Sequence, residues 1–239
     1  MTDYDPRLVD VYDQDNPDGP DHDFYRGLAG EASARSVVDL GCGTGILTVT
    51  LASVERSVVG VDPSASMIGF ARNRPGAAHV DWVVGDSRSI PGTGYDFAAM
   101  TGNVVQAIPG AAWPRTLRDL RLAMGNGGTL AFESRNPAVR AWDNWAFDDK
   151  RRDSLHGPLI ERRTVSAPAP GVVELQTSTT FAATGECVDE TQQLAFRDRN
   201  TITRDVRAAG FAVEATYGDW IRTPFTDHAP IMVFVCRAV

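Results

Sequence analysis

The chain has 239 residues, of which 43% are hydrophobic and 23% are charged, the composition of an ordinary globular domain. Its formal net charge of -8 disfavours partners whose affinity depends on neutralising phosphates, such as nucleic acids and anionic membranes. The N-terminus is acidic without an apolar run, and the three cysteines are widely separated. We therefore expect a cytoplasmic protein with reduced thiols and no metal site.

From Val37 onward, apolar stretches alternate with turn signals as in β-α-β units, which predicts a mostly parallel sheet covered by helices. The expected strands, in chain order, are SVVDL (36–40), SVVGVD (57–62), HVDWVVGD (79–86), YDFAAMTG (95–102) and GGTLAFESRNP (127–137). Helices are expected from Ile46 to about Ser53, from Pro63 to Gly76, and over WPRTLRDLRLAM (113–124), where apolar residues recur at helical spacing.

The sequence pattern changes after the fifth strand. Residues 150–199 alternate apolar and polar side chains between Pro/Gly turns, as antiparallel strands do. We expect an antiparallel insertion that shapes a substrate pocket or forms a dimer interface, in a protein that is a monomer or a homodimer. A helix over 200–210 and two strands, over 211–220 and 231–239, are predicted to close the chain.

The turn after the first strand is rich in glycine and reads Asp39-Leu-Gly41-Cys-Gly43-Thr-Gly45-Ile46. Such turns let backbone amides and a helix N-terminus approach a ligand closely. Ile46 replaces the third glycine of the dinucleotide fingerprint, and Asp39 would repel a pyrophosphate, so an NAD-dependent dehydrogenase is disfavoured. Asp39 suits a ligand with a cationic amine, such as the methionine portion of S-adenosylmethionine.

Two further acids, Asp62 and Asp86, end the next two strands. In a parallel sheet they share one edge with Asp39, where ligands bind in open α/β folds. Asp62 is placed to accept hydrogen bonds from both hydroxyls of a ribose, or else to cap the helix that begins near Pro63. Asp86, with Ser87 beside it, is a candidate for the adenine amino group or a plain turn residue.

In order and spacing, VVDLGCGTG (37–45), VVGVDPSASMIGFAR (58–72) and VVGDSRSIP (83–91) resemble the successive cofactor motifs of class I S-adenosylmethionine-dependent methyltransferases. The resemblance covers about residues 35–135. It implies an α/β fold: a three-layer, Rossmann-like seven-stranded sheet whose last strand is antiparallel, with the antiparallel β insertion after strand 5. It also implies S-adenosyl-L-methionine as cofactor and S-adenosyl-L-homocysteine as product.

The same resemblance implies a set of cofactor-binding residues. Met67 would pack on the adenine or belong to the core, and Thr101 and Asn103 would lie beside the sulfonium. The full set is Asp39, Gly41, Cys42, Gly43, Thr44, Gly45, Asp62, Pro63, Met67, Asp86, Ser87, Thr101 and Asn103.

Methyl transfer from a sulfonium is an in-line displacement, for which the protein mainly supplies alignment and a dry site. A base is needed only when the acceptor must lose a proton. We expect residues 1–34 to form an N-terminal cap over the cofactor and residues 35–239 to form the methyltransferase domain. Within this cap, His22 is the candidate base, and Tyr12 and Tyr25 are candidate aromatic covers. The alternative for His22 is a solvated loop residue, and the alternative for Tyr12 is a plain packing role.

The acceptor is expected to be a small molecule that is methylated on nitrogen or oxygen. The insertion resembles that of small-amine methyltransferases, but Gln106 stands near the position where sugar-amine members often carry a histidine. The candidate acceptor contacts follow the fifth strand: Arg135, Asn136, Arg140, Trp142 and Trp145. Four arginines at 151, 152, 162 and 163 form either a solvated face or a site for an anionic acceptor. An RNA methyltransferase and a catalytically silent adenosyl-binding scaffold stay open as alternatives.

Overall fold

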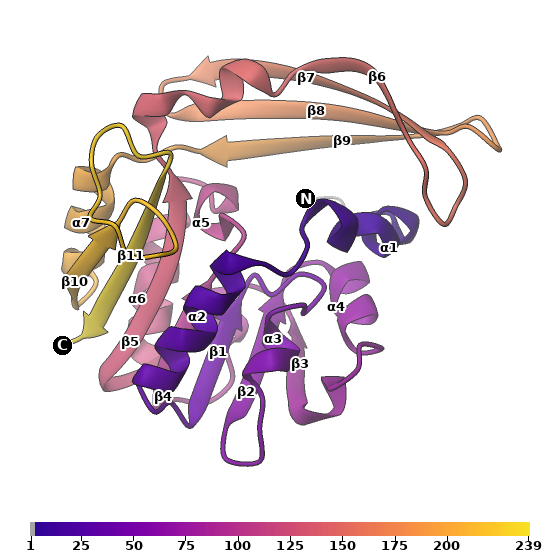
Figure 1. Cartoon of the computed structure of the whole chain (residues 1–239). Helices are drawn as coiled ribbons and strands as arrows, with labels where there is room; N and C mark the ends of the chain where they lie inside the picture. The colour runs from indigo at the N-terminus through magenta and orange to yellow at the C-terminus, as the bar shows by residue number, and fades with distance from the viewer. Residues whose placement is uncertain (1–2) are drawn as a thin grey trace.

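The computed structural model describes residues 3–239, which form a seven-stranded sheet flanked by helices and a separate four-stranded sheet (Figure 1). We call the four-stranded sheet (β6 to β9) the lid sheet, because it lies over one edge of the larger sheet. Within residues 3–239, no helix combines the length and the apolar character that crossing a membrane requires.

The larger sheet has the strand order β10-β11-β5-β4-β1-β2-β3. Strands β1 to β5 pair in parallel, and β11 runs antiparallel to both of its neighbours, as expected for the last strand. The bounds are β1 Ser36–Leu40, β2 Ser57–Asp62, β3 Val80–Val84, β4 Tyr95–Met100, β5 Met124–Arg135, β10 Phe211–Tyr217 and β11 Ile231–Ala238.

The central strands are apolar on both faces because helices cover both. Along β5, Leu130 and Phe132 pack into one hydrophobic core, while Ala131 between them packs into the other. The first core is completed by helices α5 Val104–Ala107, α6 Trp113–Ala123 and α7 Arg199–Ala208, and the second by α2 Pro20–Glu31 and α3 Thr48–Leu51. Successive strand residues point to opposite faces, so a doubly covered strand reads as a continuous apolar run.

The lid sheet consists of four antiparallel strands: β6 Phe147–Arg152, β7 Leu159–Ala169, β8 Val172–Phe181 and β9 Glu186–Ala195. One face carries two apolar clusters. Leu159 and Phe181 pack on helix α1, and Val173 and Leu175 pack with Trp142. The opposite face is polar. The lid sheet therefore has an inward and an outward face, as its alternating sequence predicts.

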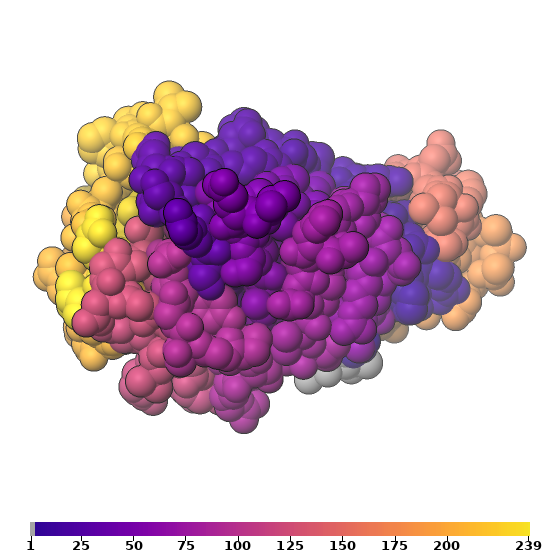
Figure 2. All heavy atoms as spheres, turned by 90° about the horizontal axis from the view of Figure 1, so that it is seen from below, coloured from indigo at the N-terminus to yellow at the C-terminus, as the bar shows by residue number. Residues whose placement is uncertain are grey.

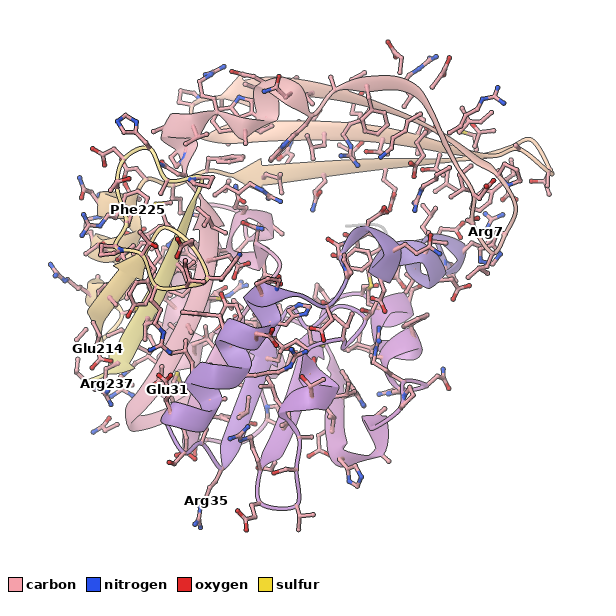
Figure 3. The ribbon with its side chains drawn as sticks, in the orientation of Figure 1. Arg7, Glu31, Arg35, Glu214, Phe225 and Arg237 are labelled. Carbon is pink, nitrogen blue, oxygen red and sulfur yellow. The ribbon has the colours of Figure 1, made fainter. Side chains whose placement is uncertain are left out.

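Helix α1, Pro6–Asp15, connects the lid sheet to the main domain. It starts at the N-cap Asp5, and its Arg7 reaches Glu186 at the far end of the lid sheet (Figure 3). On its other side, Asp13 accepts a hydrogen bond from Thr44 in the glycine turn and pairs with Arg74. Seen from below in Figure 2, the lid sheet extends past the main domain on the side of this segment.

Most predicted elements are found, with shifted ends. Strand β2 has the predicted bounds, and the sixth and seventh strands and α6 and α7 lie where the sequence places them. The helix expected from Ile46 is shorter, because α3 starts at Thr48 after two turn residues. Helix α4, Ala65–Ala71, ends before the predicted Gly76. The remaining short helices are η1 Ala77–His79, η2 Ser87–Ser89, η3 Pro137–Val139 and η4 Ala141–Asn144.

Candidate active site

The glycine turn that follows β1 has a backbone that other residues adopt poorly. Gly41, Gly43 and Gly45 all have positive φ angles, of 79°, 54° and 75°. A Cβ on Gly41 would also lie 2.4 Å from Cγ2 of Val104, a distance that real Cβ atoms do not show. All three glycines therefore serve the turn conformation, and Gly41 also allows the close approach of α5.

Asp39 lies beneath this turn and carries a buried oxygen atom with no partner. The residue is 1% exposed. Its Oδ2 accepts a hydrogen bond of 2.7 Å from the Thr48 hydroxyl, while Oδ1 has no hydrogen-bond partner. Burial raises the pKa of Asp39 to about 6, which the Thr48 hydrogen bond and the nearby charge of His22 partly offset. A buried, unpaired carboxylate oxygen is costly, and a cationic amine would satisfy it.

Asp62 ends β2 and holds the turn from the other side. Its Oδ2 accepts a hydrogen bond from the Gly43 amide, and its Oδ1 accepts one from the Ser64 amide, both at 2.9 Å. The N-cap of α4 is Ser64, whose hydroxyl accepts from the Met67 amide, so the alternative that Asp62 caps this helix is wrong. Each carboxylate oxygen of Asp62 keeps lone-pair capacity for a ribose hydroxyl.

Asp86 and Ser87 at the end of β3 are engaged by protein groups. The Asp86 carboxylate pairs with Arg88 and Arg115, and it accepts a hydrogen bond from the Arg88 amide. The Ser87 hydroxyl is buried and donates to Asp119 at 2.6 Å. An adenine amino group that binds the Asp86 carboxylate would therefore have to share it with Arg88 and Arg115.

Other residues of the expected cofactor set are mostly buried around the turn. Met67, Cys42, Thr44 and Thr101 are all less than 10% exposed, whereas Pro63 is exposed. The thiol of Cys42 is free, and burial raises its pKa well above the usual range. Met67 is therefore buried near the start of α4, and both core packing and contact with the adenine stay open for it.

Asn103, which follows β4, is held by a residue that the sequence analysis does not single out. Asn103 has a left-handed backbone, with φ of 60°, and its amide donates to Oε1 of Glu133 on β5. Oε2 of the same carboxylate accepts a hydrogen bond from the Tyr25 hydroxyl. Burial raises the pKa of Glu133 to about 7, and these two hydrogen bonds oppose the rise. Tyr25 is fully buried, so it is core and not the aromatic cover that we expected.

His22 and Tyr12 come to the same edge of the sheet. His22, on α2, is 7% exposed, and its Nδ1 lies 2.8 Å from Oδ1 of Asp18. When Nδ1 is protonated and donates a hydrogen bond to Asp18, Nε2 is unprotonated and can accept a proton. Tyr12, on α1, is half-buried, and burial raises the pKa of its phenol. The negative charge of Asp62 raises this pKa further, and the positive charge of Arg135 lowers it.

The residues predicted to contact the acceptor do not all face one space. The Asn136 amide donates to the carbonyls of Asp227 and Ala229, and its oxygen accepts from the Ala138 amide. The polar atoms of the Asn136 side chain are thus bound to backbone groups. The prediction that Asn136 contacts the acceptor is wrong, and its role is structural. Arg140 is exposed and paired with Asp143.

Trp142, Trp145 and Arg135 remain between the end of β5 and the lid sheet. Trp142 packs edge-on against Phe196, with ring centroids 4.4 Å apart. The Arg135 guanidinium lies 5.0 Å from the Trp145 ring centroid, and its Nη1 donates to Gln106 at 3.0 Å. Gln106, which follows β4, is therefore the residue that orients Arg135.

The inward face of the lid sheet carries a polar row between its two apolar clusters. Arg163, Thr177 and Glu190 are directly opposite one another on β7, β8 and β9. Burial raises the pKa of the Tyr4 phenol, and the negative charges of Glu190 and Asp62 raise it further. The Tyr4 ring lies edge-on to the Tyr12 ring, with ring centroids 6.5 Å apart. We use the name acceptor space for the region between the end of β5 and the lid sheet, around this row, the two tyrosines and Arg135.

A cavity of about 600 Å³ lies elsewhere, near the N-terminal ends of β4 and β5. Its charged side chains are bound within the protein: Arg237 pairs with Glu214, Arg222 pairs with Glu31, and Asp96 accepts hydrogen bonds from two backbone amides. Figure 3 shows Glu31, Glu214 and Arg237 far from the lid sheet. This cavity is therefore separate from the edge where Asp39 and Asp62 meet. No cluster of His, Cys, Asp or Glu that could bind a metal ion occurs in the described chain.

Known proteins match both the sequence and the fold. Residues 37–128 match the family model of a methyltransferase domain. A demethylmenaquinone methyltransferase from Clavibacter sepedonicus is 30% identical over 193 residues, which cover 78% of this chain and 69% of that protein. Two further curated relatives are matched over only about a quarter of their own length.

Two solved structures resemble the whole chain in fold. The CcbJ methyltransferase from Streptomyces caelestis superposes with a TM-score of 0.78 at 22% identity, covering 99% of this chain and 100% of the other. CalS10 from Micromonospora echinaspora, an amino pentose methyltransferase solved with bound S-adenosylmethionine, gives a TM-score of 0.67 at 18% identity and covers all of both chains.

The fold and the glycine-turn site define a Rossmann-like class I methyltransferase, and the chain belongs to the S-adenosylmethionine-dependent methyltransferase family. Its cofactor is S-adenosyl-L-methionine.

Proposed function

We propose that the protein transfers the methyl group of S-adenosylmethionine to a nitrogen or oxygen atom of a small-molecule acceptor. The observation that carries this proposal is the unpaired Oδ1 of Asp39, which lies beneath a glycine turn with positive φ angles that Asp62 also holds. A buried carboxylate oxygen without a partner suits the ammonium of the methionine moiety. Asp62, one strand further along the same edge, suits the ribose hydroxyls.

The acceptor is proposed to be small because the lid sheet and α1 cover the edge of the main sheet where it would bind. The lid sheet lies above the edge of the main sheet, and α1 joins the two through contacts on both of its sides. The net charge of -8 opposes a nucleic acid in this space. The amino pentose named for CalS10 is an acceptor of the size that we have in mind.

S-adenosylmethionine, when bound, would supply a methyl group on a sulfonium, and its leaving group is a neutral thioether that needs no acid. The residues of this chain then align the acceptor and exclude water. Tyr4 and Tyr12 are both partly buried at the acceptor space, and we assign them to that exclusion. We assign the same role to Thr101 and Asn103, which follow β4, and Glu133 holds the Asn103 amide.

His22 is our candidate for a base when the acceptor must lose a proton. Replacing His22 with glutamine is expected to lower kcat by about a hundredfold, the lower range for general base catalysis, and to leave the Kd for S-adenosylhomocysteine within a few-fold. Steady-state kinetics with the first acceptor that turns over, measured as a pH profile, would test this. The exposed His79→Gln serves as control. An unchanged kcat and pH profile in His22→Gln would remove the residue from the mechanism.

The proposed function is tested by calorimetric titration with S-adenosylmethionine and S-adenosylhomocysteine, with NADH as a control ligand. We expect both adenosyl ligands to bind saturably and NADH not to bind. Asp62→Ala should raise both Kd values at least about tenfold, because it removes charge-assisted hydrogen bonds. Asp81→Ala, an exposed acid on the neighbouring strand β3, should not change them. If neither adenosyl ligand binds the wild-type protein, the proposal fails.

A further inference from the structure

Two arginines stand apart from the others in how their guanidinium groups are bound. Among residues 3–239, arginines that are not exposed pair with a carboxylate or donate to several backbone carbonyls, as Arg197 does to Val105 and Ile108. Arg135 and Arg163 do neither. Both belong to the acceptor space.

Arg135 uses only one of its five N–H donors within the protein. Its Nη1 donates to the Gln106 amide oxygen at 3.0 Å, and its plane lies over Trp145. Gln106 itself is fully buried, so this contact fixes the position of the guanidinium. A half-buried guanidinium with four unused donors is incompletely compensated for its loss of water.

Arg163 repeats this arrangement on the lid sheet. Its Nε donates to the Thr177 hydroxyl at 3.1 Å, and its guanidinium lies 5.1 Å from the centroid of the Phe147 ring. Glu190 lies opposite Thr177 on the next strand and interacts with Arg163 through its charge, but the two side chains form no ion pair within 4 Å. Trp145 and Phe147 are two residues apart, so one short segment supports both arginines.

We propose that the acceptor carries an anionic group, a carboxylate or a phosphate, and that Arg135 and Arg163 bind this group from the β5 side and the lid side of the acceptor space. The inference rests on the proposed function, whose acceptor it specifies. A planar guanidinium fork held against a ring presents paired donors to two oxygens of one anion, which a lysine could not do. Arg140 has no part in it, since Asp143 already occupies its donors.

The test uses the full chain saturated with S-adenosylhomocysteine and three probes of similar shape: benzoate, phenyl phosphate and neutral benzamide. Binding is followed by NMR titration. At least one anion should bind about tenfold or more tightly than benzamide. Arg135→Gln and Arg163→Gln should each weaken binding of that anion by about tenfold while leaving benzamide unchanged. The tighter of the two anions identifies the group as carboxylate or phosphate.

Arg162→Gln is the matched control, because Arg162 is the neighbouring residue on the outward face and pairs with Asp148 and Asp149. It should bind all three probes as the wild type does. Equal binding of benzamide and both anions, no detectable binding of either anion, or wild-type affinity in the Arg135 and Arg163 variants would overturn the inference. Because all these titrations start from the S-adenosylhomocysteine complex, a failure of cofactor binding is seen first and counts against the proposed function instead.

Discussion

Replacing Asp39 with alanine is expected to raise the Kd for S-adenosylmethionine by more than about a hundredfold. Among residues 3–239, the substitution removes the only buried carboxylate that has an oxygen atom without a hydrogen-bond partner. An ammonium that enters this position would lose its water and gain no charge partner, which costs about 2 to 5 kcal/mol. Calorimetric titration at pH 7.5 measures the effect directly.

The pH dependence of cofactor binding separates this role from a structural one. Burial raises the pKa of Asp39 to about 6, so the carboxylate becomes protonated as the pH falls through 6 and can no longer pair with the ammonium. The wild-type Kd should rise by about tenfold for each further unit of pH below 6. Asp39→Asn should bind weakly at every pH between 5 and 8, without this slope. A wild-type Kd that stays constant between pH 5 and 7 would contradict the assignment.

Glu133→Ala is expected to lower the free energy of unfolding by about 2 to 6 kcal/mol, because it leaves the Tyr25 hydroxyl and the Asn103 amide buried without an acceptor. Glu133→Gln should cost far less, since an amide oxygen can still accept from Asn103. Urea unfolding monitored by circular dichroism would give both values. Cofactor affinity should fall in the alanine variant as well, because Asn103 loses the contact that holds its left-handed backbone.

The same acid sets the direction in which stability changes with pH. Burial raises the pKa of Glu133 from 4.5 to about 7, so the folded protein binds this proton more tightly than the unfolded chain does. The stabilising effect of that proton is complete below about pH 4.5 and is lost as the pH rises through 7, by roughly 3 kcal/mol. Glu133→Gln should lack this contribution. If wild type and Glu133→Gln lose the same stability between pH 4.5 and 7.5, Glu133 is not the titrating group.

The sequence predicts the main sheet well because its signals are local. Strands β1, β2 and β3 are short apolar runs that each lead to an acid, and a parallel sheet places the ends of such strands at one edge. The glycine turn is equally local, since positive φ angles limit the choice of residue. The short helix α3 is predicted less well, because the turn takes up the residues where its first turn was expected.

The parts of the site that the sequence does not predict depend on contacts between distant segments. Glu133 lies in an apolar strand, and only the fold brings Tyr25 and Asn103 to it. Arg163 reads as part of a basic patch, and the register of the lid sheet is needed to separate it from Arg162 on the other face. Asn136 fails as an acceptor contact for the same reason, since its partners lie about 90 residues further along the chain.

Two of the buried acids, Asp39 and Glu133, have a consequence for the protein inside a cell. Near neutral pH both weaken the folded state of the empty protein, and a bound ammonium neutralises the first of them. A ligand that binds only the folded state stabilises it by mass action, and the fraction of unfolded chains exposed to proteases falls accordingly. The lifetime of the protein should therefore follow the supply of its methyl donor, with copies that lack it being the first to be degraded.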